Sequence, residues 1–118
     1  GTSCVAAVSE VVETTLRGRG YAVSRNKPYA GGFITEHYGN PAAGLHAIQI
    51  EVNRALYMDE RRFELSSDFT QLSQDLVSLA DKLAAIPLEE LRPYRAAGTG
   101  VSPMPRCTNM HVRRTKSK

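Results

Sequence analysis

Three polar side chains share one side of a segment that otherwise alternates like a β-strand. Over residues 46–53, one side of the strand would carry His46, Ile48, Ile50 and Val52, and the other side would carry Ala47, Gln49, Glu51 and Asn53. Gln49, Glu51 and Asn53 therefore point to the same side of the predicted strand. In layered α/β proteins reactive groups gather where strands end, and a partly desolvated carboxylate there can act as a general base toward water. Glu51 is therefore a candidate catalytic base, and the alternative is a structural ion pair with Arg54 or with a lysine elsewhere.

Two histidines and an arginine near this segment could also carry chemistry. His37 and His46 are candidate metal ligands or proton carriers, and the alternative is that they are hydrogen-bonding loop residues. Their spacing matches none of the usual zinc motifs, such as His-x-x-Glu. Arg54 directly follows the strand and could bind a substrate carboxylate through two hydrogen bonds. Its alternative partner is Asp59 or Glu60, in a surface ion pair.

Helical and strand periodicity predicts the elements that must position these groups. Apolar residues recur at helical spacing over residues 5–17 and again over 69–86, which predicts two amphipathic helices. A short strand is predicted at residues 21–25. A turn of helix is predicted at residues 54–59, directly after the strand that carries Glu51.

A long loop is predicted between the two strands. Residues 26–44 are rich in glycine, proline and asparagine, and a short extended piece is expected at residues 33–35. Loops of this length in a compact domain are usually functional or disordered, and the aromatic residues in this one argue against disorder. The run from Ala30 to Gly32 lacks the spacing of a phosphate-binding motif, so a tight backbone passage is the better interpretation.

The order of elements is helix, strand, long loop, strand, helix, which predicts a layered α/β domain. Two strands are too few for a stable independent sheet, and both helices need a larger sheet to cover their apolar faces. We therefore interpret residues 1–90 as part of a bigger domain. Residues 91–118 show no periodicity and contain three prolines, which predicts a disordered or irregular basic tail.

Charge is distributed unevenly along the 118-residue chain. All 12 acidic residues lie within residues 1–90, whereas residues 91–118 hold seven of the 15 basic residues. A basic tail can contact nucleic acid or a membrane by charge alone, but a solvated tail is favoured and neither is expected as a partner. The alternative function is a non-catalytic binding or structural fragment whose tail contacts an acidic partner.

Several sequence features bear on size and compartment. A chain of this length holds one domain at most, and its apolar content of 42% is typical of a globular protein. No apolar run approaches the roughly 20 residues of a membrane span, and the N-terminus lacks the pattern of a signal peptide. Cys4 and Cys107 form neither a disulfide framework nor a metal-binding spacing, so a reducing cytoplasm is the expected location.

Three sequence segments together resemble a known enzyme family. The segments are "GTSC", "NKPYAGGFITEHYG" and "GLHAIQIEVNRALYMDE". They are similar to an Asn-x-Pro-Tyr-x-Gly-Gly loop, an Ile-Thr-x-His-Tyr-Gly segment and a His-Ala-x-Gln-x-Glu strand that leads into Leu-Tyr-Met-Asp-Glu. This order resembles the C-terminal half of the N-formylglutamate amidohydrolase family, over roughly residues 1–87.

The resemblance implies a partial fold similar to that of the zinc carboxypeptidases, with a mixed sheet flanked by helices. It implies hydrolysis of N-formyl-L-glutamate, a small N-acyl amino acid, to formate and glutamate in one route of histidine breakdown, with zinc as the cofactor. Glu51 matches the catalytic glutamate that activates metal-bound water. Thr35, His37 and His46 lie in motifs that line the substrate pocket, whereas Arg54 is a candidate from its chemistry alone. The zinc ligands are expected upstream, so this chain is expected to supply none and to be inactive alone.

Overall fold

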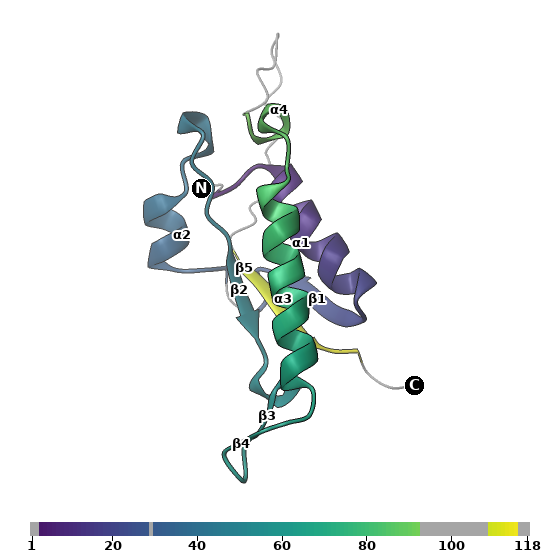
Figure 1. Cartoon of the computed structure of the whole chain (residues 1–118). Helices are drawn as coiled ribbons and strands as arrows, with labels where there is room; N and C mark the ends of the chain where they lie inside the picture. The colour runs from purple at the N-terminus through teal and green to yellow at the C-terminus, as the bar shows by residue number, and fades with distance from the viewer. Residues whose placement is uncertain (1–2, 29, 93–108, 116–118) are drawn as a thin grey trace.

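The computed structural model of the chain is a mixed α/β structure in which helices pack against a small sheet (Figure 1). The described part of the chain consists of residues 3–28, 30–92 and 109–115. The sheet has the order β1-β5-β2, with β1 at Tyr21–Arg25, β5 at Asn109–Arg114 and β2 at Gln49–Val52. β5 pairs antiparallel with β1 and parallel with β2, so it occupies the centre of this sheet.

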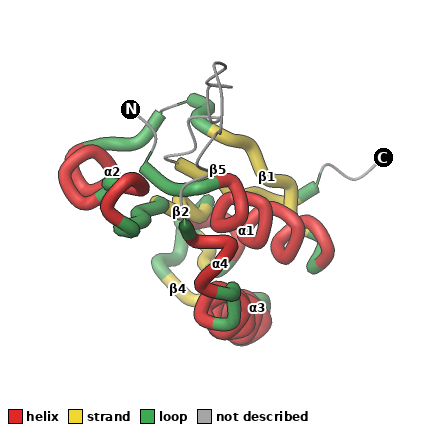
Figure 2. Tube along the Cα trace, turned by 90° about the horizontal axis from the view of Figure 1, so that it is seen from above, coloured by secondary structure: helices red, strands yellow, loops and turns green. Residues whose placement is uncertain are grey.

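The two longest described helices lie on the same side of the sheet. They are α1 (Ala6–Gly18) and α3 (Phe69–Ala84), and the view from above shows them together below the strands (Figure 2). A hairpin of β3 (Met58–Asp59) and β4 (Glu64–Leu65) projects beyond the end of β2. The shorter pieces are the helices α2 (Phe33–Tyr38) and α4 (Leu88–Leu91) and the 3-10 helices η1 (Pro41–Ala43) and η2 (Arg54–Leu56). None of the described helices has the length and apolar character that crossing a membrane requires.

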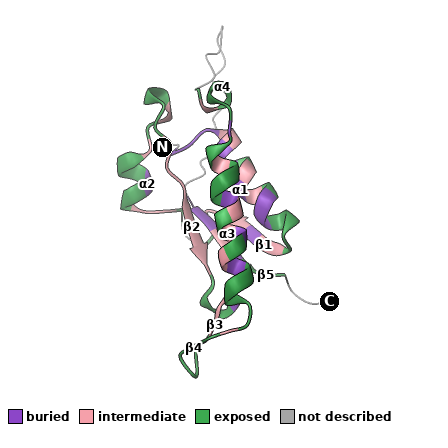
Figure 3. Cartoon of the chain, viewed as in Figure 1, coloured by how far each residue is buried: buried purple, intermediate pink, exposed green. Residues whose placement is uncertain are grey.

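The core forms between these two helices and one face of the sheet. Val12 and Leu16 of α1 and Met110 of β5 are fully buried. Ile50 and Val52 of β2 pack against the same cluster. Figure 3 shows the buried residues gathered where α1, α3 and the strands face one another. Because side chains alternate along a strand, every second residue of β2 and β5 must face away from this core.

The elements with clear periodicity agree with the predictions. α1 buries Val8, Val12 and Leu16, which are four residues apart and therefore lie on one helix face. Gly20 has a φ of 92° and makes the turn into β1, a conformation that glycine adopts without strain. α3 and β1 also lie where they were predicted. The strand predicted over residues 46–53 is shorter, because only Gln49–Val52 pairs with β5.

The prediction for residues 33–35 was wrong. They were expected to be extended, but Phe33–Tyr38 forms the helix α2. The Thr35 hydroxyl donates a hydrogen bond to the Gly32 carbonyl at 2.9 Å, and this local bond supports the helical turn. A helix of six residues is too short to display helical periodicity, so its signal was hidden among the surrounding glycines and prolines.

The prediction of a wholly irregular tail was also wrong. Asn109–Arg114 forms a strand, and residues 93–108 of the predicted tail lie outside the described residues. Met110 and Val112 are the two apolar positions of this strand, and both are buried. Two alternating apolar residues are a weak signal in a sequence. The strand that carries them lies between β1 and β2 and completes a three-stranded sheet.

Candidate active site

Polar side chains from two strands meet on the sheet face opposite α1 and α3. In the parallel pairing of β2 with β5, Gln49 lies beside Asn109 and Glu51 beside His111. Because Ile50 packs against the core, its neighbours Gln49 and Glu51 face the other way. We call these four polar residues the Glu51 cluster.

Three side chains contact the Glu51 carboxylate. Gln49 Nε2 donates a hydrogen bond to Oε1 at 2.8 Å, and Asn109 Nδ2 donates to the same oxygen at 3.1 Å. Nε2 of His111 lies 2.9 Å from Oε2. A carboxylate only accepts hydrogen bonds, so we assign the proton in this contact to Nε2. Nδ2 of Asn109 also lies 3.3 Å from Nε2 of His111, so the amide contacts both members of this pair.

The carboxylate is held by a well-anchored strand and stays accessible. Asn109 is fully buried. The Asn26 N–H donates to the Asn109 carbonyl at 2.9 Å, and the Asn109 N–H donates to Oδ1 of Asn26 at 3.1 Å. The side chain of Glu51 is 35% exposed and that of His111 is 22% exposed. Glu51 is therefore oriented from one side while solvent or a small molecule can reach the other.

An open depression of about 630 Å³ lies beside the Glu51 cluster. Glu51 and His111 line it together with three basic residues, Lys27, Arg54 and Arg113. Among the described residues, one further acidic residue contributes to the lining, so basic side chains outnumber acidic ones there. A surface with this balance favours a small anion, because the opposite charges attract at short range.

Arg54 forms a surface ion pair with Glu60, which was the alternative to binding a substrate carboxylate. Its Nε lies 3.0 Å from Oε1 of Glu60, and the two side chains are 70% and 54% exposed. An ion pair with this exposure contributes little to stability, because water screens it. Both residues line the depression beside Glu51, so a substrate carboxylate can replace Glu60 at little cost.

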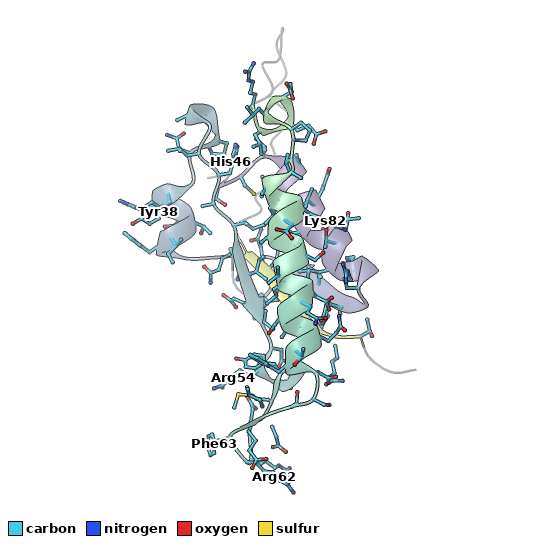
Figure 4. All side chains as sticks on the ribbon, viewed as in Figure 1. Tyr38, His46, Arg54, Arg62, Phe63 and Lys82 are labelled. Carbon is cyan, nitrogen blue, oxygen red and sulfur yellow. The ribbon has the colours of Figure 1, made fainter. Side chains whose placement is uncertain are left out.

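His46 binds the backbone through both ring nitrogens. The Val5 N–H donates to Nδ1 at 3.3 Å, and Nε2 lies 2.7 Å from the Leu91 carbonyl. Since Nδ1 accepts, Nε2 must carry the proton, and the ring is neutral in this arrangement. His46 joins the start of α1 to the end of α4, and it lies at the opposite end of β2 from Arg54 (Figure 4).

Thr35 and His37 lie on α2 and are not among the described residues that line the depression. Thr35 is fully buried, and its hydroxyl is used by the Gly32 carbonyl. His37 is exposed and stacks on Phe33, with ring centroids 4.8 Å apart. Of the five candidate residues, the structure therefore brings Glu51 and Arg54 together, and it does not bring Thr35, His37 or His46 to them.

Comparison with known proteins agrees with the motif resemblance. The model of the N-formylglutamate amidohydrolase family matches residues 1–58. This range contains Glu51 and Arg54, but it ends before β5 begins.

Two curated proteins that are similar to this chain carry the name N-formylglutamate deformylase. The protein from Pseudomonas putida is 36% identical over 76 residues, which cover 63% of this chain and 28% of that protein. The protein from Pseudomonas aeruginosa is 33% identical over 79 residues, which cover 65% of this chain and 30% of that protein. The chain thus spans less than a third of the length of these relatives. No solved structure matches the chain significantly.

Two residues of the Glu51 cluster were missed in the sequence. Asn109 and His111 lie in the segment "NMHVRR", which is outside the range that matches the family. The sequence predicts an irregular tail for this segment. The signal available was the alternation of Met110 and Val112 with polar residues, which is typical of a half-buried strand. No local pattern indicates that His111 pairs with Glu51, because the pairing depends on strand order.

A second polar network ties the helices to the sheet. Asp75 of α3 is buried and accepts hydrogen bonds from Arg19 Nη1 at 3.1 Å, Gln71 Nε2 at 3.0 Å and the Tyr21 hydroxyl at 2.5 Å. Burial, followed by this hydrogen bond to Asp75, raises the pKa of Tyr21 to about 12. These residues line a depression of about 400 Å³. Because three donors use the Asp75 carboxylate, we assign the network a structural role.

Proposed function

We propose that this chain supplies the general base and part of the substrate site for hydrolysis of the N-formyl amide of N-formyl-L-glutamate. The products are formate and glutamate. The observation that carries the proposal is the Glu51 carboxylate, held by three side chains at a basic depression and lying within the residues that match the family. The names of the curated relatives support the choice of substrate.

Glu51 acts in this proposal by moving a proton. Oε2 takes a proton from a water molecule while the water oxygen adds to the formyl carbon. The bond between the formyl carbon and the nitrogen then breaks, and the proton passes to the departing nitrogen, which becomes the amine of glutamate. Oε1 already accepts two hydrogen bonds, so Oε2 is the oxygen with capacity left for this step.

The substrate would bind through its negative charges. N-formyl-L-glutamate carries two carboxylates, and the depression offers Lys27, Arg54 and Arg113. In the proposal Arg54 exchanges its exposed partner Glu60 for a substrate carboxylate. Thr35, His37 and His46 remain candidate substrate-binding residues only if another part of the larger domain brings α2 and the start of β2 to the same pocket.

Zinc enters the proposal from the family resemblance, and the described residues do not by themselves fit a catalytic zinc site. Such a site needs three protein ligands and an open position. Within residues 3–28, 30–92 and 109–115, no group of three His, Cys, Asp or Glu side chains could hold a metal ion. The zinc would therefore be held by ligands outside the described residues, and no step above depends on it.

The remaining parts of the proposal concern context. We propose that the chain completes a larger layered domain similar to that of zinc carboxypeptidases, located in the cytoplasm. The alternative function, a binding fragment whose basic tail contacts an acidic partner, gains no support from the described part of the tail. There Arg114 pairs with Asp68 of the same chain, and the strand lies within the sheet.

The proposed function is tested by a chimera. The segment of the Pseudomonas putida deformylase that matches this chain is replaced by this chain, and formate release from N-formyl-L-glutamate is measured with zinc present. We expect turnover by the chimera and none by the chain alone. N-formyl-L-leucine, which lacks the second carboxylate, should be a poorer substrate. A folded chimera without activity would contradict the proposed function, and turnover by the chain alone would contradict the role as a part of a larger site.

A further inference from the structure

The Glu51 cluster contains a histidine that the family match does not cover. His111 is the cross-strand neighbour of Glu51, and it lies in β5, beyond residues 1–58. Its Nε2 is 2.9 Å from Oε2 of Glu51. The carboxylate therefore accepts hydrogen bonds from two amide groups at Oε1, and the imidazole Nε2 of His111 lies beside Oε2.

We infer that His111 is a positioning residue for Glu51, which it orients by donating its Nε2 proton to Oε2. The inference rests on the proposed function for its catalytic meaning, because Glu51 is the proposed base. Gln49 and Asn109 fix Oε1, and a third donor on Oε2 fixes the plane of the carboxylate. The remaining lone pair of Oε2 then points in a single direction, toward the depression that Glu51 and His111 line.

The strand arrangement explains why His111 can do this. β5 is held on both sides, by β1 and by β2, so its backbone position is well determined. Met110 and Val112 on either side of His111 are buried in the core, which sends the imidazole to the opposite face. A hydrogen bond to a charged carboxylate is stronger than one between neutral groups, so the contact can hold a side chain that is 35% exposed.

The test uses the nitrogen-bound protons of the imidazole rings in the full 118-residue chain, with 15N-labelled histidine. An imidazole proton is seen by NMR when a hydrogen bond slows its exchange with water. We expect an Nε2 proton signal from His111, and a second from His46, whose Nε2 lies 2.7 Å from the Leu91 carbonyl. Exposed His37, whose ring stacks on Phe33, should give none.

Substitution of Glu51 decides the inference. Glu51→Ala should remove the His111 signal and keep the His46 signal, which also shows that the variant is folded. The matched control Glu64→Ala changes an exposed carboxylate on β4 and should keep both signals. A His111 signal that survives Glu51→Ala, or a wild-type chain that shows only the His46 signal, would overturn the inference.

The effect of His111 on kcat and KM is measured separately, in the chimera. His111→Ala should lower kcat about tenfold and leave KM nearly unchanged, since the residue acts through Glu51 and does not contact substrate. His111→Gln, which keeps a donor near the position of Nε2, should restore most of the loss. If the chimera is inactive with all its residues intact, the proposed function fails while the NMR result still decides whether His111 positions Glu51.

Discussion

Glu51 of β2 and His111 of β5 lie side by side in the sheet, with 2.9 Å between Nε2 of the imidazole and Oε2 of the carboxylate. In the sequence, Asn109 follows Glu51 by 58 residues, and His111 lies two residues beyond Asn109. The pair joins a residue inside the family match to one outside it. The contact therefore links the candidate base to the central strand of the sheet, and its consequences can be measured.

Removing the charge of Glu51 should abolish most activity. In the chimera, Glu51→Gln is expected to lower kcat by about 10² to 10⁴, the range that a general base contributes, with a much smaller change in KM. Formate release under substrate saturation measures this. Glu64→Gln is the matched control, because Glu64 is an exposed glutamate on the hairpin. An active Glu51→Gln variant would exclude Glu51 as the base.

Arg54 should affect substrate binding more than turnover. Arg54→Ala in the chimera removes a possible charged hydrogen bond to a substrate carboxylate and is expected to raise KM about tenfold, which corresponds to roughly 1.4 kcal/mol. Glu60→Gln frees Arg54 from its ion pair and should leave KM equal or lower. Equal KM values for wild type and Arg54→Ala would remove Arg54 from the site.

The central position of β5 can be tested through its buried residues. Met110 is fully buried, so Met110→Ala should lower the free energy of unfolding by about 2–5 kcal/mol. Arg113, on the same strand, is exposed, and Arg113→Ala should change the free energy of unfolding by less than about 0.5 kcal/mol. Urea denaturation of the full chain measures both. Similar stabilities for the two variants would show that this strand is not part of the core.

His46 should prove structural. His46→Ala leaves the Val5 N–H and the Leu91 carbonyl without their partner, which is expected to lower the free energy of unfolding by about 1–3 kcal/mol. His37→Ala is the control, because the ring of His37 is exposed. Thermal unfolding of both variants checks the difference. Should the two substitutions have the same small effect, His46 would be available for another role.

Stability should fall at high pH through Tyr21. The pKa of Tyr21 is raised from 10.0 to about 12 in the folded chain, so the folded state keeps a proton that the unfolded state loses first. The stabilisation is complete below pH 10 and is lost as the pH rises from 10 to 12. The difference in urea midpoint between wild type and Tyr21→Phe should therefore shrink or reverse over this range. A constant difference would contradict the pKa shift.

Sequence periodicity predicted the elements whose signals are local. The spacing of Val8, Val12 and Leu16 is sufficient for α1, because a helix of 13 residues repeats its apolar face several times. The alternation around Glu51 likewise placed its side chain on the polar side of a strand. The motif resemblance was equally local, since residues 1–58 carry the family match.

The tertiary structure decided what depends on distant segments. α2 was too short to show a period, and β5 offered only Met110 and Val112 as apolar positions. Arg54 had two interpretations, binding of a substrate carboxylate or a surface ion pair. The ion pair with Glu60 could be recognised only in the folded chain. The sequence by itself determined that Glu51 is a polar residue on a half-buried strand and which family its segment resembles. Only the folded chain could place His111 and Asn109 beside it, because strand order is set by how the whole sheet buries its apolar face and not by any local pattern.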